Sequence, residues 1–562
     1  MNKFKLALFA VITAGAVGCG GGGGGGAGEA VGNGIGAVTD TTSAAVGTAN
    51  QAVTDTTQVL TNTHPSSDQD PEGIIEEATF LYERNLPVLT ADKYSHLDCP
   101  ETFSYGGAPG LQTIIPVHIN NDNHKDFIIQ YVCSQHPQGT LHNDDTQDTV
   151  VAYVSDENGS YREANQEVFG KTVVSVNGLG KYKLSDVNRD GKKDVVWALN
   201  QEDGRSSAGA EGWYNNGGTP VVLMSNTNGF DIQPLPVYSW FFALEVIAKP
   251  DYTDVILGTF TEEDYKLRYQ NGMWTTSRID PIDVPISAME VMSYKQSTEM
   301  IYYVTKTGKE VMLSQVSLWD NTLHGYTATG FGSATMDGTP INYDVMEAEA
   351  VVKWGGWNTN GEYAGQNVPV LNIDGVQMAY ANYDNICLLG ELVPGGKDYV
   401  VAQVWGESNI SGTPWKDGDF VVEGGKDSAH GSALHFYEIA DDGSVKRVPT
   451  PINNEDLTVS PMGTMLCEDI NGDGLADIAL SPKTQMTKNG GRSGAPSIYM
   501  TDGNGMFNLL PQSDMPTVPA GGKFGDYWQA AGDIVDVDSD GDYDFLMYST
   551  SQPYAPYIIY TH

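Results

Sequence analysis

The sequence predicts an all-β protein built from repeats of four strands each. Gly and Tyr are abundant, at 65 and 29 of the 562 residues, which is typical of turn-rich β proteins and not of helical bundles. Apolar runs are separated by Asn-Gly or Asp-Gly pairs, as at Asn158-Gly159, Asn271-Gly272 and Asp442-Gly443. Such pairs favour the positive φ angles that tight β-hairpin turns need. A recurring acidic loop with a strand-like apolar run behind it completes the repeat.

The acidic loop has its fullest form at Asp536-Val-Asp-Ser-Asp-Gly-Asp-Tyr-Asp544. Oxygen-bearing side chains alternate along it, and Gly541 permits a sharp turn because glycine adopts positive φ without steric cost. Ca²⁺ takes about six to eight oxygen ligands, which such a loop brings to one point. The ligands predicted for three Ca²⁺ sites are Asp186, Asn188, Asp190 and Asp194; Asp469, Asn471, Asp473 and Asp477; and Asp536, Asp538, Asp540 and Asp544. The alternative is that the loops are acidic surface turns.

A fourth copy of the loop is degraded. It keeps Asn120, Asp122 and Asp126 as candidate ligands, but His118 replaces the first acid and Asn123 replaces the glycine. Whether this loop binds Ca²⁺ therefore stays open.

An apolar run follows each closing acid, as in Phe545-Leu-Met547, and no loop carries Glu at position 12. This excludes an EF-hand, which needs that Glu and a following helix. The pattern resembles the FG-GAP/VCBS family, the calcium-loop repeats of β-propellers that are also found in integrin α-subunits. The resemblance implies a single β-propeller of four-stranded blades over residues 100–562, with calcium ions that rigidify the blade hairpins.

The spacing of the closing acids sets the expected number of blades. The first two are about as far apart as the last two, and the long gap between Asp194 and Asp477 leaves room for about three more blades. We expect seven blades; six or eight stay possible, because residues 326–380 are either an insertion or a further blade. A strand from residues 85–115 is expected to join the last blade and cover an exposed sheet edge.

The N-terminus has the pattern of an export signal. A basic start precedes an apolar run from Leu6 to Val17, which is too short to span a membrane as a helix. The run ends at Ala16-Val17-Gly18-Cys19, which resembles the lipobox of bacterial lipoproteins. The resemblance implies removal of residues 1–18, acylation of Cys19 and insertion into outer-membrane lipid, giving a surface-exposed outer-membrane lipoprotein. An ordinary secretory signal is the alternative.

Two segments separate this signal from the repeats. Residues 19–72 are rich in Gly, Ala and Thr, lack the apolar residues for a core, and are expected to be a flexible tether. Residues 73–99 are expected to be a short helical or extended lead-in, with one helix over 74–86 as an option.

The cysteines indicate disulfides. Apart from Cys19, the chain has Cys99, Cys133, Cys387 and Cys467, and an even number in an exported protein permits two disulfides. Of the three possible pairings we favour Cys99–Cys133 and Cys387–Cys467. The second pair would join equivalent inner strands of neighbouring blades; buried free thiols are the alternative.

The functional classes are bounded by charge and motifs. A formal net charge of −42 repels nucleic acid, which is therefore not an expected partner. No Gly-x-Ser-x-Gly, HExxH or phosphate loop is present. Aromatic residues in variable loops are candidates for binding a glycan or a protein, because such loops on a rigid scaffold concentrate binding. These residues are Trp213, Tyr214, Trp354, Trp357, Trp405 and Trp415.

The favoured hypothesis is a calcium-stabilised, lipid-anchored surface β-propeller without enzymatic activity, which binds an extracellular glycan or protein in adhesion or recognition. One alternative is a carbohydrate-active enzyme, either a polysaccharide lyase or a hydrolase. A lyase needs a base and a cation that neutralises the substrate, and the sequence does not mark such a pair. The other alternative is a structural subunit of a cell-envelope assembly.

Overall fold

The structure is a computed structural model that describes residues 80–85 and 110–561 apart from gaps. The larger gaps are 133–148, 175–180, 199–218, 260–263, 280–292, 354–366, 408–419, 423–429, 453–457, 460–464, 481–485, 488–496, 512–526, 529–533 and 550–555. The signal, the acylation site and the tether predicted from the sequence lie outside the described residues. No helix among the described residues is long and apolar enough to cross a membrane.

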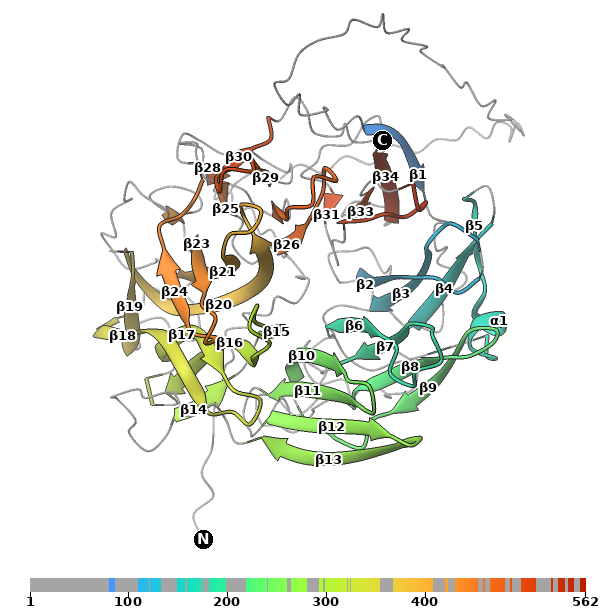
Figure 1. Cartoon of the computed structure of the whole chain (residues 1–562), viewed down its shortest axis with the longest axis horizontal. Helices are drawn as coiled ribbons and strands as arrows, with labels where there is room; N and C mark the ends of the chain where they lie inside the picture. The colour runs from blue at the N-terminus through green and yellow to red at the C-terminus, as the bar shows by residue number, and fades with distance from the viewer. Residues whose placement is uncertain are drawn as a thin grey trace, which may run out of the picture. The chain divides into compact units, whose positions relative to one another are not determined.

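Four antiparallel sheets have four strands each, as the repeat predicts (Figure 1). The first contains β2 (Gly110–Val117), β3 (Asp126–Val132), β4 (Thr149–Ser155) and β5 (Tyr161–Glu163), followed by the short helix α1 (Asn165–Val168). The second contains β6 (Tyr182–Ser185), β7 (Asp194–Trp197), β8 (Val221–Ser225) and β9 (Phe230–Pro234). The third contains β10 (Phe241–Ala248), β11 (Thr253–Thr259), β12 (Asp264–Gln270) and β13 (Met273–Ile279). The fourth contains β26 (Met465–Glu468), β27 (Asp477–Leu480), β29 (Ser497–Thr501) and β30 (Phe507–Leu509).

The hairpin turns are where the sequence places them. β12 and β13 are joined by Asn271 and Gly272 alone, with φ of 54° and 78°. These positive angles give the turn a twist that matches the two strands. The turns at Gly159, Gly443 and Gly505 also have positive φ.

Residues 293–448 depart from the four-stranded repeat and form one sheet of eleven strands. Its strands are β14 (Ser293–Gln296), β15 (Met300–Val304), β16 (Glu310–Asp320), β17 (Gly325–Ala334), β18 (Pro340–Lys353), β19 (Asn367–Ile373), β20 (Val376–Glu391), β21 (Asp398–Glu407), β22 (Phe420–Val422), β23 (His430–Ile439) and β24 (Val445–Val448). The described residues among 326–380 belong to β17, β18, β19 and the start of β20, so they are neither a separate insertion nor a separate four-stranded blade. The seven-blade count stays a prediction.

The last sheet combines the two ends of the described chain. β33 (Asp544–Ser549) pairs with β32 (Ile534–Val535), β31 (Tyr527–Trp528) and β34 (Pro556–Thr561), and β1 (Phe80–Asn85) pairs with β34. An N-terminal strand therefore joins the last sheet, as expected, but it lies before residues 85–115. The extended option holds for this part of the lead-in, and the helix does not. A separate small sheet pairs β25 (Thr458–Val459) with β28 (Met486–Thr487).

Hydrophobic clusters join sheets that follow one another in the chain. Ile128 and Trp197 belong to one cluster shared by the first and second sheets, and a second cluster joins the second and third sheets. The eleven-stranded sheet shares a cluster with the fourth sheet, where a disulfide also links Cys387 of β20 to Cys467 of β26. This is the favoured pairing between neighbouring sheets; Cys99 and Cys133 lie outside the described residues.

Candidate functional site

The four closing aspartates fasten the acidic loops to their sheets. Asp126, Asp194, Asp477 and Asp544 are all fully buried. In the second sheet one carboxylate oxygen of Asp194 accepts the N–H of Val187 at 2.7 Å, and the other accepts the N–H and the hydroxyl of Ser225 at 2.7 and 2.8 Å. Asp126 and Asp477 bond in the same way to their loops and third strands. The closing acid thus has a structural task whether or not a cation binds.

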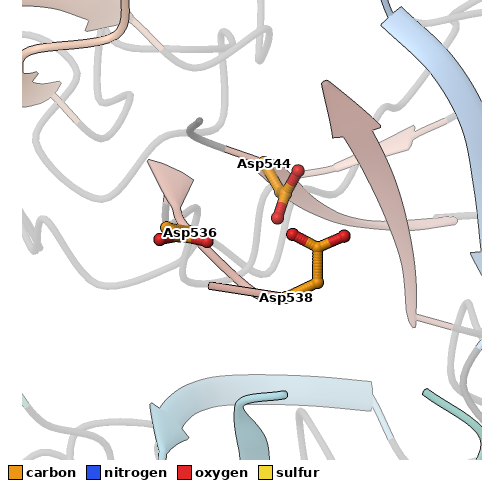
Figure 2. A group of neighbouring side chains, drawn as sticks. All are labelled: Asp536, Asp538 and Asp544. Carbon is orange, nitrogen blue, oxygen red and sulfur yellow. The ribbon is translucent and has the colours of Figure 1, made fainter. Parts of the chain in front are cut away.

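The last loop is the one that fits a cation. Carboxylate oxygens of Asp536, Asp538 and Asp544 all lie within 4.8 Å of one another (Figure 2). The Oδ1 atoms of Asp536 and Asp538 are buried without a hydrogen-bond partner. Burial and the neighbouring carboxylates of Asp540 and Asp536 raise the pKa of Asp538. Crowded carboxylate oxygens, two of them without a donor, are the kind of ligand set that a hard cation such as Ca²⁺ prefers.

The two middle loops differ because position 3 is Asn and not Asp. In the second sheet the Asn188 amide donates to Asp190 at 3.1 Å, and Asp186 accepts the N–H groups of Asp190 and Gly191 at 3.0 and 2.9 Å. The loop of the fourth sheet repeats these bonds with Asn471, Asp469, Asp473 and Gly474. In these loops some carboxylate oxygens accept hydrogen bonds from the loop itself, and the four predicted ligands include one carboxylate fewer than in the last loop. Their predicted ligands are correctly grouped, but a three-carboxylate cluster is found only in the last loop among the described residues.

The first loop replaces a cation ligand with a pair of bases. Nζ of Lys125 lies 2.9 Å from Nε2 of His118, which stands where the other loops have their first acid. The Asn120 amide donates to Asp122 at 2.7 Å, and the Ser155 hydroxyl contacts Asp122 at 3.1 Å. The candidate ligands Asn120, Asp122 and Asp126 are therefore already bonded within the protein, and the loop fits a cation poorly.

A pocket of about 290 Å³ opens between this first loop and the loop of the second sheet. Pro116, Val117, Leu184 and Phe230 give it an apolar lining, whereas His118, Asn120, Lys125, Lys192, Lys193 and Asn226 add polar and basic groups. Gly229 forms part of the wall, where a Cβ atom would come within 2.1 Å of the Val168 carbonyl oxygen. Only glycine lets the chain approach this closely.

The pocket contains a neutral imidazole beside a cation. Burial and the adjacent Lys125 lower the pKa of His118, and burial lowers the pKa of Lys125. Two bases 2.9 Å apart cannot both carry a proton of their own on facing nitrogens, so the ammonium donates to the Nε2 lone pair. Lys192 is held across the pocket by a 2.8 Å bond from Nζ to the Asn226 carbonyl oxygen. Such a combination of base and cations was not recognised in the sequence.

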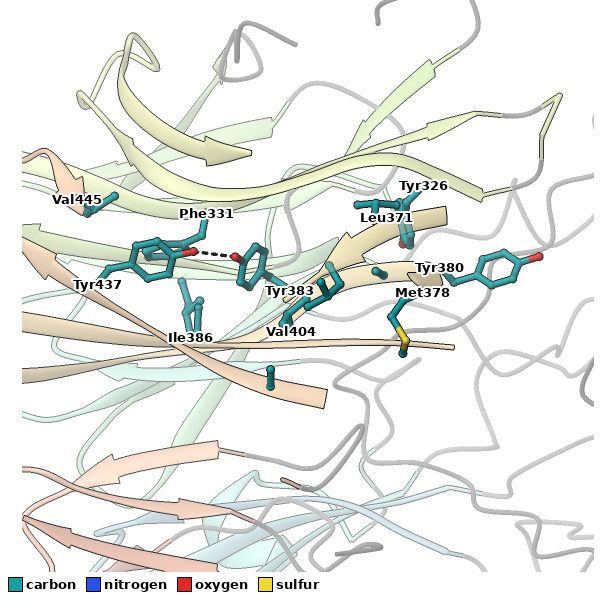
Figure 3. Close-up of a cluster of buried hydrophobic side chains, with 14 of the residues drawn as sticks. Tyr326, Phe331, Leu371, Met378, Tyr380, Tyr383, Ile386, Val404, Tyr437 and Val445 are labelled. Carbon is teal, nitrogen blue, oxygen red and sulfur yellow. Dashed lines mark hydrogen bonds between the residues drawn. The ribbon is translucent and has the colours of Figure 1, made fainter. Parts of the chain in front are cut away.

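A second group of titratable side chains lies inside the eleven-stranded sheet. Nε2 of His435 is 3.0 Å from Asp374, and Nδ1 is 2.9 Å from the Tyr383 hydroxyl. That hydroxyl is 2.7 Å from the Tyr437 hydroxyl (Figure 3), which contacts Asp344 at 3.2 Å. Arg447 donates to both oxygens of Asp374 at 2.7 and 2.9 Å. We call Asp344, Tyr437, Tyr383, His435 and Asp374 the buried chain.

The buried chain has four contacts and, with a neutral imidazole, three protons. His435, Tyr383 and Tyr437 each bring one, so one contact has no hydrogen atom between its partners. Burial lowers the pKa of His435 and raises the pKa of both tyrosines, while His435 and Arg447 hold the pKa of Asp374 well below its usual range despite its own burial. Tyr383 and His435 are 0% and 1% exposed, so no substrate reaches them.

The aromatic residues predicted to bind a ligand are not tested by this structure. Trp213, Tyr214, Trp354, Trp357 and Trp415 lie outside the described residues. Trp405 is not in a variable loop, because β21 continues through it to Glu407 and pairs it with Asn382 and Ser432.

No protein-family model matches the chain, and no curated protein matches it in sequence. Among solved structures it is similar to the exotype rhamnogalacturonan lyase YesX at 10% identity and a TM-score of 0.37, over 86% of this chain and 75% of that one. It is similar to the α-L-arabinanase of Penicillium chrysogenum at 9% identity and a TM-score of 0.30, over 80% and 93% of the two chains. For a putative exo-β-1,3-galactanase from Bifidobacterium bifidum s17 the values are 12% and 0.26, over 61% and 92%.

These neighbours correct the favoured hypothesis of a non-enzymatic surface protein that binds a glycan or protein. Their printed descriptions are those of enzymes that act on carbohydrates, and the hypothesis is given up. TM-scores this low assign no fold, substrate or reaction to this chain. The function is therefore argued from the pocket and its residues.

Proposed function

We propose that the protein is a carbohydrate-active enzyme whose reaction takes place in the pocket between the first and second sheets. The composition of this pocket carries the proposal, because an apolar lining faces a few convergent polar groups in a space of about 290 Å³. Small-molecule sites combine these two features. A sugar unit presents C–H faces to an apolar lining and oxygen atoms to amide and ammonium groups, so both kinds of surface have a counterpart.

His118 supplies the chemistry in this proposal. Its lowered pKa keeps the imidazole neutral near pH 7, which is the form that acts as a general base. The side chain is exposed at the pocket and is held in place by Lys125. A perturbed base beside a specific charge partner in a pocket is a candidate for catalysis.

The test is product release from polysaccharides. The full chain is incubated with a panel of neutral and acidic glycans, and new reducing ends and shortened chains are measured. The proposal expects release from at least one polymer and its loss in His118→Ala. Binding to a glycan without any cleavage, under conditions in which the fold is intact, would contradict it.

We also propose that the sheets are blades of a calcium-binding β-propeller of the FG-GAP/VCBS type, anchored through Cys19. Asp536, Asp538 and Asp544 would hold the cation in the last loop, and the ion would neutralise their crowded charges. Binding to the folded state would add stability by mass action.

Asp538→Asn tests this cation proposal without an activity assay. The change removes repulsion among three carboxylates, so it should raise the melting temperature in chelator. It should also reduce the further rise on adding Ca²⁺, because a ligand is weakened. Asp231→Asn, the same kind of substitution at an exposed position of β9, serves as the control and should change neither value. A rise with Ca²⁺ that is undiminished in Asp538→Asn would mean that the ion binds elsewhere.

A further inference from the structure

The pocket has a charge opposite to that of the whole protein. The chain has 30 basic and 72 acidic residues, yet three lysines and no acidic residue are among the described residues that line this pocket. Asp126 and Asp194 of the two loops are fully buried and bonded to backbone N–H groups. Asp122 and Asp536 act electrostatically on His118 and Lys125 but do not line the pocket. A local concentration of cations on an acidic protein selects an anionic ligand.

The residues that provide this charge lie in two of the acidic loops. His118 and Lys125 occupy positions 1 and 8 of the degraded loop, and Lys192 and Lys193 occupy positions 7 and 8 of the loop in the second sheet. Loop position 1 normally serves a cation, so replacement of its acid by His118 costs the cation site a ligand. The first loop thus has a pocket-lining histidine where the other loops have a predicted cation ligand.

The lining also discriminates between two reactions on a glycosidic bond. Hydrolysis by the common mechanism uses a pair of carboxyl groups, one as acid and one as base or nucleophile. No carboxyl group is among the described residues that line this pocket. Elimination next to a carboxylate needs instead a neutral base for a carbon-bound proton and cations that stabilise the negative charge which develops on the carboxylate. His118 and the three lysines meet that requirement.

We propose, on the basis of the function proposed above, that the substrate is a uronate-containing glycan and that the pocket cleaves it by β-elimination. The substrate carboxylate accepts from Lys125, Lys192 and Lys193. When the substrate binds, its carboxylate draws the Lys125 ammonium away from His118. Binding therefore also frees the lone pair on Nε2 of His118.

The reaction balances without a cofactor. Nε2 of His118 takes the proton from the sugar carbon next to the carboxylate. The C–H electron pair forms a carbon–carbon double bond, and the bond from the adjacent carbon to the glycosidic oxygen breaks. That oxygen keeps the bonding electrons and takes a proton from water or a lysine. The imidazolium returns its proton to solvent, and no water is added across the bond.

The experiment compares polygalacturonate, the same polymer with its carboxyl groups reduced to alcohols, and a neutral galactan. Reducing ends and the ultraviolet absorbance of an unsaturated uronate are recorded together. We expect both signals with polygalacturonate and neither signal with the other two polymers. Lys192→Gln combined with Lys193→Gln should raise KM by roughly 10- to 100-fold, the value of losing charge-assisted hydrogen bonds. The exposed Lys446→Gln of β24 has the same charge change and should leave KM unaltered.

The two proposals fail in different ways. Reducing ends without ultraviolet absorbance, or cleavage of the carboxyl-reduced polymer, would leave a carbohydrate-active enzyme standing and overturn elimination of a uronate. An unchanged KM in the double lysine variant would overturn the role of the pocket cations. The absence of any product from all three polymers would overturn the uronate proposal, and the wider glycan panel would then decide the proposed function.

Discussion

Two histidines of this protein have a lowered pKa for the same first reason, desolvation, which is partial for the exposed His118 and nearly complete for the buried His435. His118 is exposed at the pocket, and its contacting side chain is a second base, Lys125. His435 is 1% exposed, and both of its ring nitrogens contact groups of the buried chain, Asp374 and Tyr383.

The difference shows that a shifted pKa does not by itself mark a catalytic residue. A base must be able to exchange its partner for a substrate, and the Lys125–His118 contact can open toward the pocket. The His435 contacts cannot open without disrupting the core of the eleven-stranded sheet. Their partner Tyr383 belongs to the same hydrophobic cluster as Phe331, Ile386 and Val404 (Figure 3). We therefore expect the first histidine to determine turnover and the second to determine stability.

The largest expected effect is on catalysis. His118→Ala removes the general base and should lower kcat by roughly 10²- to 10⁴-fold. The free energy of unfolding should change little, because the side chain is exposed. Steady-state kinetics and denaturant unfolding measured on the same preparation check both statements. Full activity in His118→Ala would remove the distinction between the two histidines.

The corresponding change in the buried chain should act on stability. His435→Ala leaves a cavity and removes the partner of both Asp374 and Tyr383, which should cost about 2–5 kcal/mol of unfolding free energy. His435→Gln keeps one donor and one acceptor and should cost less. Denaturant unfolding gives the values, and kcat of the folded fraction should stay unchanged. A loss of kcat in folded His435→Gln would assign a catalytic role to the buried chain.

Local patterns were sufficient for the parts of the fold that depend on neighbouring residues. Asn271 and Gly272 make the predicted turn because their positive φ is a property of the residue types. The closing acids occupy the predicted start of a strand, as Asp194 does at β7. Cys387 and Cys467 pair as expected because each precedes the turn of its own repeat.

The parts that depend on distant residues were not predictable in this way. β20 is 16 residues long, and no local motif marks its length or its pairing within so large a sheet, so the eleven-stranded sheet was not anticipated. The pocket combines loops of two repeats, and Lys192 and Lys193 had no pattern beyond being basic in an acidic chain. The one available signal was the departure at His118, which indicates a loop with a different task. The buried chain joins three strands, β18, β20 and β23, and a turn that no sequence period relates.

A smaller effect is expected on the pH dependence of stability. The unfolded chain binds a proton at His435 near the ordinary pKa of 6.5, whereas the folded chain binds it only at lower pH. The unfolded state therefore holds more protons below about pH 6.5, and stability falls on acidification by up to about 1.4 kcal/mol per pH unit. The fall ends at the folded-state pKa of His435.

His435→Gln isolates this contribution, because it cannot titrate. Asp477 acts with the opposite sign in metal-free protein: burial raises its pKa to about 7, so the folded state gains its proton first on acidification and is stabilised. The Asp477 contribution is the same in wild type and in His435→Gln, so it cancels when their unfolding free energies are subtracted. Unfolding free energies measured from pH 7 to 5 should converge as the pH falls. A constant difference would mean that His435 keeps its ordinary pKa in the fold.

The smallest effect separates the two tyrosines of the buried chain. The Tyr437 hydroxyl makes the longest contact, 3.2 Å to Asp344, and the chain has one proton too few for its four contacts. Tyr437→Phe should therefore cost about 1 kcal/mol, within the range of one ordinary hydrogen bond. Tyr383→Phe should cost more, about 2 kcal/mol, because it leaves Nδ1 of the buried His435 without this donor. Denaturant unfolding of the two variants decides the order. Equal costs would mean that the contact without a hydrogen atom is at the His435 end of the buried chain, where Arg447 already bonds to Asp374.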